Sequence, residues 1–159
     1  MTDKWDAEKY KTNFSFVHNY GNELFNLIEL DECQSILDLG CGNGELTKKF
    51  YDKGINAFGI DSSDEMLEIA ERSYPELNFY KSDAVDFEIA EKVDAVFSNA
   101  VFHWISEKNQ NKMLKCVYNA LKKNGQFVFE MGGKGNNVLI HDMLSRVFKI
   151  KGYDYNCLL

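Results

Sequence analysis

The sequence predicts an open α/β sandwich, in which a mostly parallel sheet of about five strands lies between layers of helices. Short apolar stretches alternate with amphipathic ones along the chain, and strands that alternate with helices form right-handed crossovers and a parallel sheet. Acidic or glycine-rich turns follow the apolar stretches in succession. Ligands bind outside the carboxyl ends of such strands, so we expect the functional residues directly after them.

The composition indicates one compact globular domain. The chain has 159 residues, 45% of them hydrophobic, with 12 Phe and 8 Tyr, which is enough to bury a core. The formal net charge is -7 with Lys and Arg interspersed, so we expect small-molecule partners and no nucleic acid. Residues 1–10 lack the apolar core of a signal peptide, and no run approaches the roughly 20 apolar residues of a membrane helix. We therefore expect a cytoplasmic protein without membrane contact.

The cysteines and histidines do not predict a metal site. The four cysteines are scattered without paired spacing, which favours reduced thiols over a disulfide framework. The three histidines lie far from one another and from any cysteine pair, whereas a zinc site needs ligands at close spacings.

The glycine-rich turn at residues 40–44 is the feature around which the chain is organised. Residues 35–39 are mostly apolar, which is typical of a central parallel strand covered on both faces. Gly40, Gly42 and Gly44 then remove side chains from the turn, so the backbone can adopt positive φ and a ligand can approach it closely. We interpret the turn as a cofactor site; a tight strand-to-helix corner without a ligand is the alternative.

The other elements follow the same alternation. The predicted strands cover residues 35–39, 55–60, 77–81, 93–98 and 126–131. The predicted helices cover residues 14–30, 45–53, 63–73, 106–124 and 138–150. Ser62 and Glu65 are expected to form a capping box, and the pair at 124–125 is expected to stop the fourth of these helices.

Carboxylates after the second and third strands predict an adenosine-containing ligand. Asp61 lies 21 residues after Gly40, where a carboxylate can accept hydrogen bonds from both hydroxyls of a ribose. Asp83 can reach the exocyclic amine of an adenine, and Ala84 places a backbone N–H near the ring. A dipole-favoured acid at a helix start is the alternative for Asp61.

The charges near the glycine turn distinguish two adenosine cofactors. A nicotinamide dinucleotide site needs a third glycine where this chain has Glu45. Asp38 lies two residues before the first glycine, where it would repel a pyrophosphate but suits a ligand that carries an ammonium and a sulfonium. The pattern favours S-adenosyl-L-methionine, with a nicotinamide-dependent oxidoreductase as the less favoured alternative.

These motifs resemble the class I S-adenosylmethionine-dependent methyltransferases, from residues 38–44 through 59–61 to 83–84. A narrower resemblance, to trans-aconitate methyltransferase and its relatives, rests on residues 14–17, 20–21, 98–104 and 132–136. The resemblance implies a Rossmann-like three-layer sandwich with strand order 3-2-1-4-5. It also implies a single donor-binding domain over residues 1–159, with residues 1–32 as a helical cap on a core of residues 33–159.

The resemblance implies donor contacts along the turn and the strand ends. The implied donor-binding residues are Asp38, Gly40, Cys41, Gly42, Gly44, Asp61, Ser62, Asp83, Ala84 and Asn99. Substrate or lid contacts are predicted for Tyr10, Phe16, Trp104 and Lys134, with ordinary packing or a solvated lysine as alternatives. His103 is the candidate general base, although it would only shape or bind the substrate if the acceptor is an ionised carboxylate.

The predicted function is methyl transfer from S-adenosyl-L-methionine to a small acceptor, with a carboxylate acid as the suspected acceptor and S-adenosyl-L-homocysteine as product. A donor-binding module without turnover is the alternative. The family's sheet ordinarily ends with two further strands, the last antiparallel and beside the fifth, and this sequence stops before them. We therefore expect residues 127–129 in an edge strand, and self-association through that edge or its coverage by another element.

Overall fold

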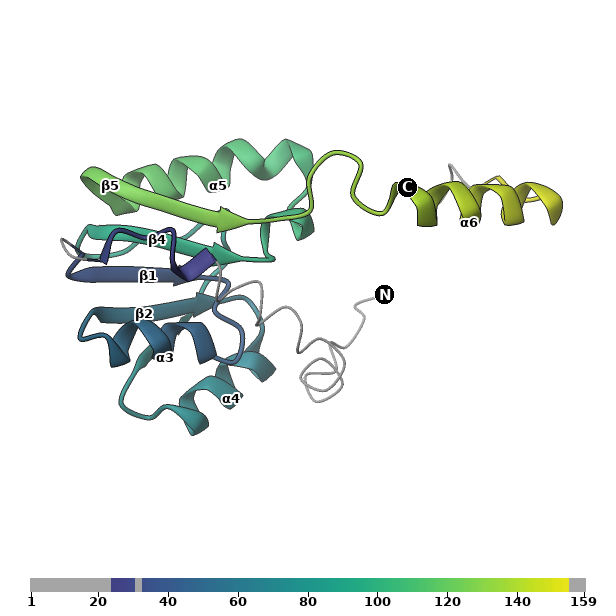
Figure 1. Ribbon diagram of the computed structural model, residues 1–159. Coiled ribbons are helices and arrows are strands. Elements are labelled where there is room, and N and C mark those ends of the chain that lie inside the picture. The colour runs from purple at the N-terminus through teal and green to yellow at the C-terminus, as the bar shows by residue number, and fades with distance from the viewer. Residues whose placement is uncertain (1–23, 31–32, 155–159) are drawn as a thin grey trace.

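The computed structural model describes residues 24–30 and 33–154 and contains a five-stranded parallel sheet with the predicted order β3-β2-β1-β4-β5 (Figure 1). The strands are β1 (Ser35–Leu39), β2 (Asn56–Asp61), β3 (Asn78–Lys81), β4 (Val93–Asn99) and β5 (Leu121–Glu130). All four neighbouring pairs are parallel. The strand order reverses beside β1, so the chain leaves β1 and β4 in opposite directions at the carboxyl edge and opens a crevice there.

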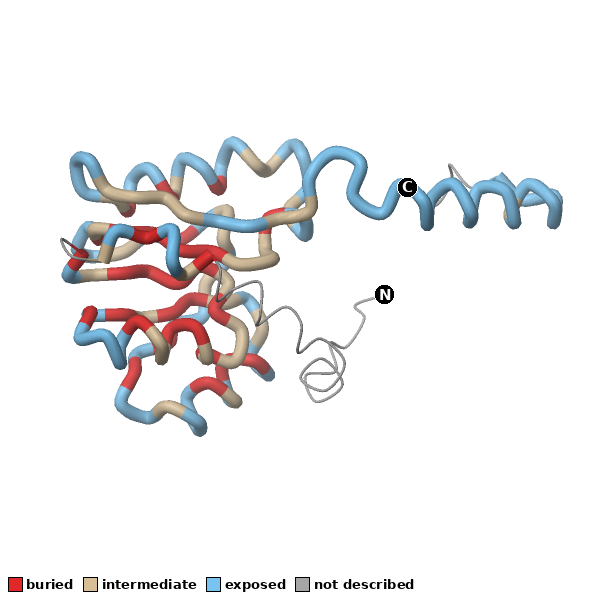
Figure 2. The backbone as a smooth tube through the Cα atoms, in the orientation of Figure 1, coloured by how far each residue is buried: buried red, intermediate tan, exposed pale blue. Residues whose placement is uncertain are grey.

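Alternating side chains of the strands bury both faces of the sheet. Ile36 of β1 packs in one cluster with Leu46 and Phe50 of helix α3 (Glu45–Asp52), on the face that α4 (Asp64–Ser73) also covers. Leu37, the next residue, packs with Met113 of helix α5 (Glu107–Ala120) on the opposite face. Figure 2 shows the buried residues concentrated in the central strands β1, β2 and β4 and on the inward sides of these helices. The predicted three-layer α/β sandwich is confirmed.

The predicted helix over residues 106–124 was wrong at its C-terminal end, because α5 ends at Ala120 and β5 begins at the next residue. Leu121 pairs with Val93, and regular pairing resumes where Gln126 pairs with Ala95, so residues 122–125 form an irregular segment within β5. Asn124 has φ 65°, a left-handed conformation that asparagine tolerates, and it turns the chain there. Pairing with β4 therefore ends the helix about one turn earlier than the sequence pattern indicates.

The cap of α4 lies one residue later than predicted. The hydroxyl oxygen of Ser63, not of Ser62, accepts a hydrogen bond from the backbone N–H of Met66 at 3.3 Å. The backbone N–H of Ser63 in turn donates to Oδ1 of Asp61 at 2.9 Å. The end of β2 and the start of α4 are thus joined through one carboxylate.

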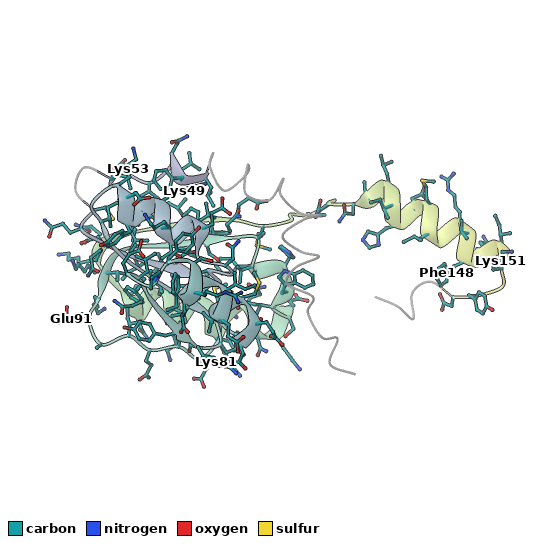
Figure 3. The ribbon with its side chains drawn as sticks, turned by 90° about the horizontal axis from the view of Figure 1, so that it is seen from below. Lys49, Lys53, Lys81, Glu91, Phe148 and Lys151 are labelled. Carbon is teal, nitrogen blue, oxygen red and sulfur yellow. The ribbon has the colours of Figure 1, made fainter. Side chains whose placement is uncertain are left out.

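Helix α6 (Val138–Ile150) extends away from the sheet after the segment 131–137 (Figure 1). None of its residues is buried, although Leu139, Met143 and Ile150 lie on one apolar side. Figure 3 shows the side chains of this helix, with Phe148 and Lys151 labelled, apart from the sheet and its helices. The predicted amphipathic helix is present, and its apolar side faces solvent.

The N-terminal helical cap lies mostly outside the described residues, as do Tyr10 and Phe16. Within residues 24–30, Leu24 and Ile28 are buried in the cluster that contains Phe50, and the ring of Phe25 stacks on that of Phe50 with 4.6 Å between centroids. Across the described ranges, no helix combines the length and the hydrophobicity that crossing a membrane requires.

Candidate functional site

The glycine turn after β1 is held against β2 and β4. Gly40, Gly42 and Gly44 have φ of 75°, 54° and 77°, which is the left-handed region that favours glycine. The backbone N–H groups of Gly40 and Cys41 both donate to the carbonyl oxygen of Ile60, at 2.8 and 3.0 Å. These bonds fix the turn beside the end of β2.

Two of the glycines serve close packing. A Cβ on Gly40 would lie 2.3 Å from Cγ2 of Val101, which follows β4. A Cβ on Gly44 would lie 2.6 Å from Cζ of Phe79 in β3, so Gly44 faces the α4 side of the core. The glycine turn after β1 therefore lies in close contact with β3 and with the segment after β4, and a larger residue at Gly40 or Gly44 would prevent these contacts.

Asp61 connects the glycine turn to helix α4. Its Oδ2 accepts a hydrogen bond from the backbone N–H of Gly42 at 2.8 Å, and its Oδ1 accepts one from the N–H of Ser63 at 2.9 Å. A carboxylate has about four acceptor positions, so these two bonds orient the group and leave capacity for two further donors. A ribose diol presents two such donors.

Asp38 is buried behind the turn, with only 2% of its surface exposed. The hydroxyl of Thr47 in α3 donates to its Oδ2 at 2.6 Å. Burial is the main cause that raises the pKa of Asp38 to about 7; the hydrogen bonds from Thr47 oppose the shift, and the nearby charge of Asp61 adds to it. Asp38 does not line the cavity described below, so its influence there is exerted through its charge.

A cavity of about 470 Å³ lies at the carboxyl edge of the sheet, within the range of small-molecule sites. Eight predicted site residues line it: Gly40, Gly42, Asp61, Ser62, Asp83, Ala84, Asn99 and Trp104. Five others are described but do not line it: Asp38, Cys41, Gly44, His103 and Lys134. Burial, together with the charges of Asp38 and Asp61, raises the pKa of the Cys41 thiol and keeps it protonated.

Eight further lining residues were not among the named site residues, although three of them lie within the strand-end stretches 38–44 and 98–104: Leu39, Ile60, Ser63, Met66, Ser82, Ala100, Val101 and Ile105. Most are apolar or small and lie next to a predicted residue, so their place at a strand end was the available signal. Met66 lies in the first turn of α4, and the packing of that helix beside the glycine turn brings it to the cavity. The charged residues of the lining are both acids, Asp61 and Asp83.

The end of β4 and the segment that follows it, residues 99–105, contribute five residues to the cavity lining. Asn99 ends the strand, and Ala100 follows it with φ 58°. A short 3₁₀ turn, η2 (Phe102–Trp104), leads to Ile105. The side chain of Trp104 is 69% exposed in this segment, and the centroid of the His103 ring lies 5.1 Å from that of Trp104.

Comparison with known proteins identifies related chains. The family described as "Methyltransferase domain" matches residues 36–125. An uncharacterised methyltransferase of Schizosaccharomyces pombe is 33% identical over an alignment of 156 residues that covers 93% of this chain and 58% of that protein. A trans-aconitate 2-methyltransferase of Agrobacterium fabrum is 35% identical over 129 residues, 80% of this chain and 50% of that protein. The chain thus spans about half the length of these relatives.

A solved structure shares the fold. The TehB-like SAM-dependent methyltransferase from Corynebacterium glutamicum has a TM-score of 0.69 and 21% identity, and the match covers 80% of this chain and 73% of that one. The matched family segment includes all of β1 but its first residue, the glycine turn, Asp61, Asp83 and the segment that follows β4.

Proposed function

The chain belongs to the class I S-adenosylmethionine-dependent methyltransferases, and we propose that it transfers a methyl group from S-adenosyl-L-methionine to a small carboxylate acceptor. One observation carries the proposal: the cavity where strand order reverses has the glycine turn on one side and both Asp61 and Asp83 in its lining. S-adenosyl-L-methionine, when bound, supplies an electrophilic methyl group on a positively charged sulfur. The residues of the chain bind it, orient it and exclude water.

The described residues fit an adenosine group. The carboxylate of Asp61 is already oriented by two backbone N–H donors and keeps acceptor capacity for the two ribose hydroxyls. Asp83 lines the cavity beside Ala84, and its Oδ1 accepts from the N–H of Val85 at 3.0 Å, which fixes the carboxylate at the end of β3. This arrangement supports adenine contacts by Asp83 and Ala84.

The charges near the cavity support a cationic donor. Asp61 and Asp83 line it, and the carboxyl of Asp38 lies buried behind the glycine turn. Carboxylates stabilise a nearby positive charge and disfavour a pyrophosphate. The same charges, and membership of the methyltransferase family, argue against the nicotinamide alternative.

A carboxylate acceptor needs no general base, because it is ionised at neutral pH. The catalytic task is then to align the acceptor oxygen with the methyl carbon and the leaving sulfur. His103 is exposed beside Trp104, where its ring can bind or shape the acceptor without removing a proton. Lys134 is exposed on the segment 131–137 and offers a cation to an acid; Tyr10 and Phe16, outside the described residues, remain proposed lid residues.

The proposal is tested by incubating the protein with labelled S-adenosyl-L-methionine and a panel of small acids that includes trans-aconitate. We expect a methyl ester by mass spectrometry for at least one acid, and loss of most donor binding and turnover in Asp61→Ala. Donor binding without transfer to any acid would instead support a binding module without turnover. Asp86→Asn removes an exposed carboxylate outside the cavity lining and serves as the control.

We also propose that two copies associate through the edge of β5. This strand pairs with β4 on one side, and the side chain of Phe129 is 42% exposed. Apolar strand edges favour pairing with another chain. Sedimentation should therefore show a dimer that Phe129→Lys shifts toward monomer; a wild-type protein that stays monomeric at high concentration would contradict the proposal.

A further inference from the structure

The segment between β4 and α5 is held in a conformation that costs energy. Ala100 has φ 58°, although a residue with a Cβ rarely adopts this region. Its backbone N–H donates to the carbonyl oxygen of Glu130, the last residue of β5, at 3.0 Å. Strain of this kind persists where surrounding contacts enforce it, and it concentrates at functional sites.

A single amide side chain fixes the turn that follows. Nε2 of Gln110, in the first turns of α5, donates to the carbonyl oxygen of Phe102 at 2.8 Å and to that of Ile105 at 2.9 Å. A primary amide has two N–H donors, so both are used, one at each end of the turn. The ring of Phe102 is buried, with its centroid 5.1 Å from that of Phe129, and anchors the turn from the inside.

The hydrogen bonds from Gln110 and the buried ring of Phe102 together fix the position of Trp104. The large indole stays 69% exposed and lines the cavity, flanked by Val101 and Ile105, which also line it. An indole that is mostly exposed forgoes the stabilisation that its burial would supply. The bonds from Gln110 therefore stabilise an arrangement that the hydrophobic effect alone does not favour.

We propose that Trp104 contacts the methyl acceptor through its indole face and that Gln110 is the positioning residue that holds it there. This inference rests on the proposed function, because it assigns the acceptor side of the same cavity. The polar groups suited to the adenosine, Asp61 and Asp83, belong to the ends of β2 and β3, whereas Trp104 follows β4. An aromatic wall suits the carbon skeleton of a small acid rather than its charge.

Two substitutions with matched controls test the assignment in the full chain. Trp104→Ala removes the indole, and Tyr118→Ala removes an aromatic ring of α5 that is 78% exposed and does not line the cavity. Gln110→Glu keeps the shape of the side chain but replaces both donors with acceptors facing two carbonyl oxygens. Asn111→Asp introduces the same charge at an exposed position one residue further along α5.

The first measurement is calorimetric titration with S-adenosyl-L-homocysteine. We expect all four variants to bind it within about twofold of wild type, because none of the four residues provides a proposed donor contact. Absence of binding to the wild-type protein would defeat the proposed function itself, separately from this inference. If Trp104→Ala, but not the other three variants, loses about tenfold or more in affinity for S-adenosyl-L-homocysteine, Trp104 is a donor-binding residue and the assignment is overturned.

The second measurement uses tryptophan fluorescence of the protein loaded with S-adenosyl-L-homocysteine in a Trp5→Phe background, where Trp104 is the remaining tryptophan. Trans-aconitate is the probe. We expect saturable quenching of Trp104, and about tenfold weaker acid binding in Gln110→Glu together with greater acrylamide quenching. In turnover, Trp104→Ala and Gln110→Glu should raise the acceptor KM more than they lower kcat. No quenching by the acid overturns the acceptor contact, and wild-type behaviour of Gln110→Glu overturns the positioning role.

Discussion

Replacing Asp38 with asparagine should stabilise the fold and weaken the site. The carboxyl is 2% exposed, and burial raises its pKa from 3.8 to about 7. At a pH above this value the folded protein holds a buried negative charge whose principal hydrogen bond comes from Thr47. Asp38→Asn removes the charge, and the new amide oxygen can still accept the bond from the Thr47 hydroxyl.

The size of the stabilisation by Asp38→Asn, and its dependence on pH, follow from the linkage between proton binding and folding. One pKa unit corresponds to about 1.4 kcal/mol, so the shift of Asp38 corresponds to at most about 4 kcal/mol. A pKa that is raised in the folded state contributes stability that is present below the unfolded value and is lost as pH rises through the folded value. The advantage of Asp38→Asn should therefore grow from about pH 4 to about pH 7 and then stay constant, reaching about 1–4 kcal/mol.

Urea denaturation at closely spaced pH values measures this difference, with Asp86→Asn as the control for the change in net charge. Calorimetry on the same samples should show weaker binding of S-adenosyl-L-methionine, because a charge that favours the cation has been removed. An Asp38→Asn protein that is less stable than wild type at pH 8, or whose advantage does not change with pH, would refute the reasoning.

Two further substitutions test the packing and charge of the framework. Asp94 accepts hydrogen bonds from the hydroxyl of Ser35 and from Nζ of Lys122, and these bonds, that of Lys122 above all, lower the pKa of Asp94 to about 2. Its stabilisation is present above pH 4 and is lost as pH falls toward 2, so denaturation of Asp94→Asn should show a loss of about 1–2 kcal/mol at pH 7 that shrinks in acid. Gly40→Ala should lower the unfolding free energy by about 1–3 kcal/mol, and adding Val101→Ala should recover part of it; full additivity of the two losses would contradict the contact.

The layered fold and the strand order could be predicted because they depend on local signals that agree with one another. Apolar stretches of strand length alternate with amphipathic ones, and Gly54 ends α3 as expected, with φ 83°. The end of α5 could not be predicted in the same way. Residues 121–124 continue the helical pattern, and only pairing of Leu121 with Val93 draws them into β5. Tertiary pairing outweighs local propensity there.

In the candidate site, too, some features could be predicted from the sequence and others could not. Asp61 ends β2, and the glycines and Asp83 come soon after β1 and β3, so their meeting at the carboxyl edge is a consequence of topology. The burial of Asp38 depends on its side of β1, and its bond to Thr47 depends on how α3 packs. Gln110 gave no signal at all, because an amide on a polar helix position is common and its two carbonyl partners lie five and eight residues before it.

Titration of S-adenosyl-L-homocysteine into the intact chain, beside an identical titration with NADH, tests the central claim most directly. We predict one binding site for S-adenosyl-L-homocysteine, its loss in Asp61→Ala, and no binding of NADH, because the acids at the glycine turn favour a cationic donor and repel a pyrophosphate. Binding of NADH, or binding of S-adenosyl-L-homocysteine that survives Asp61→Ala unchanged, would contradict the account.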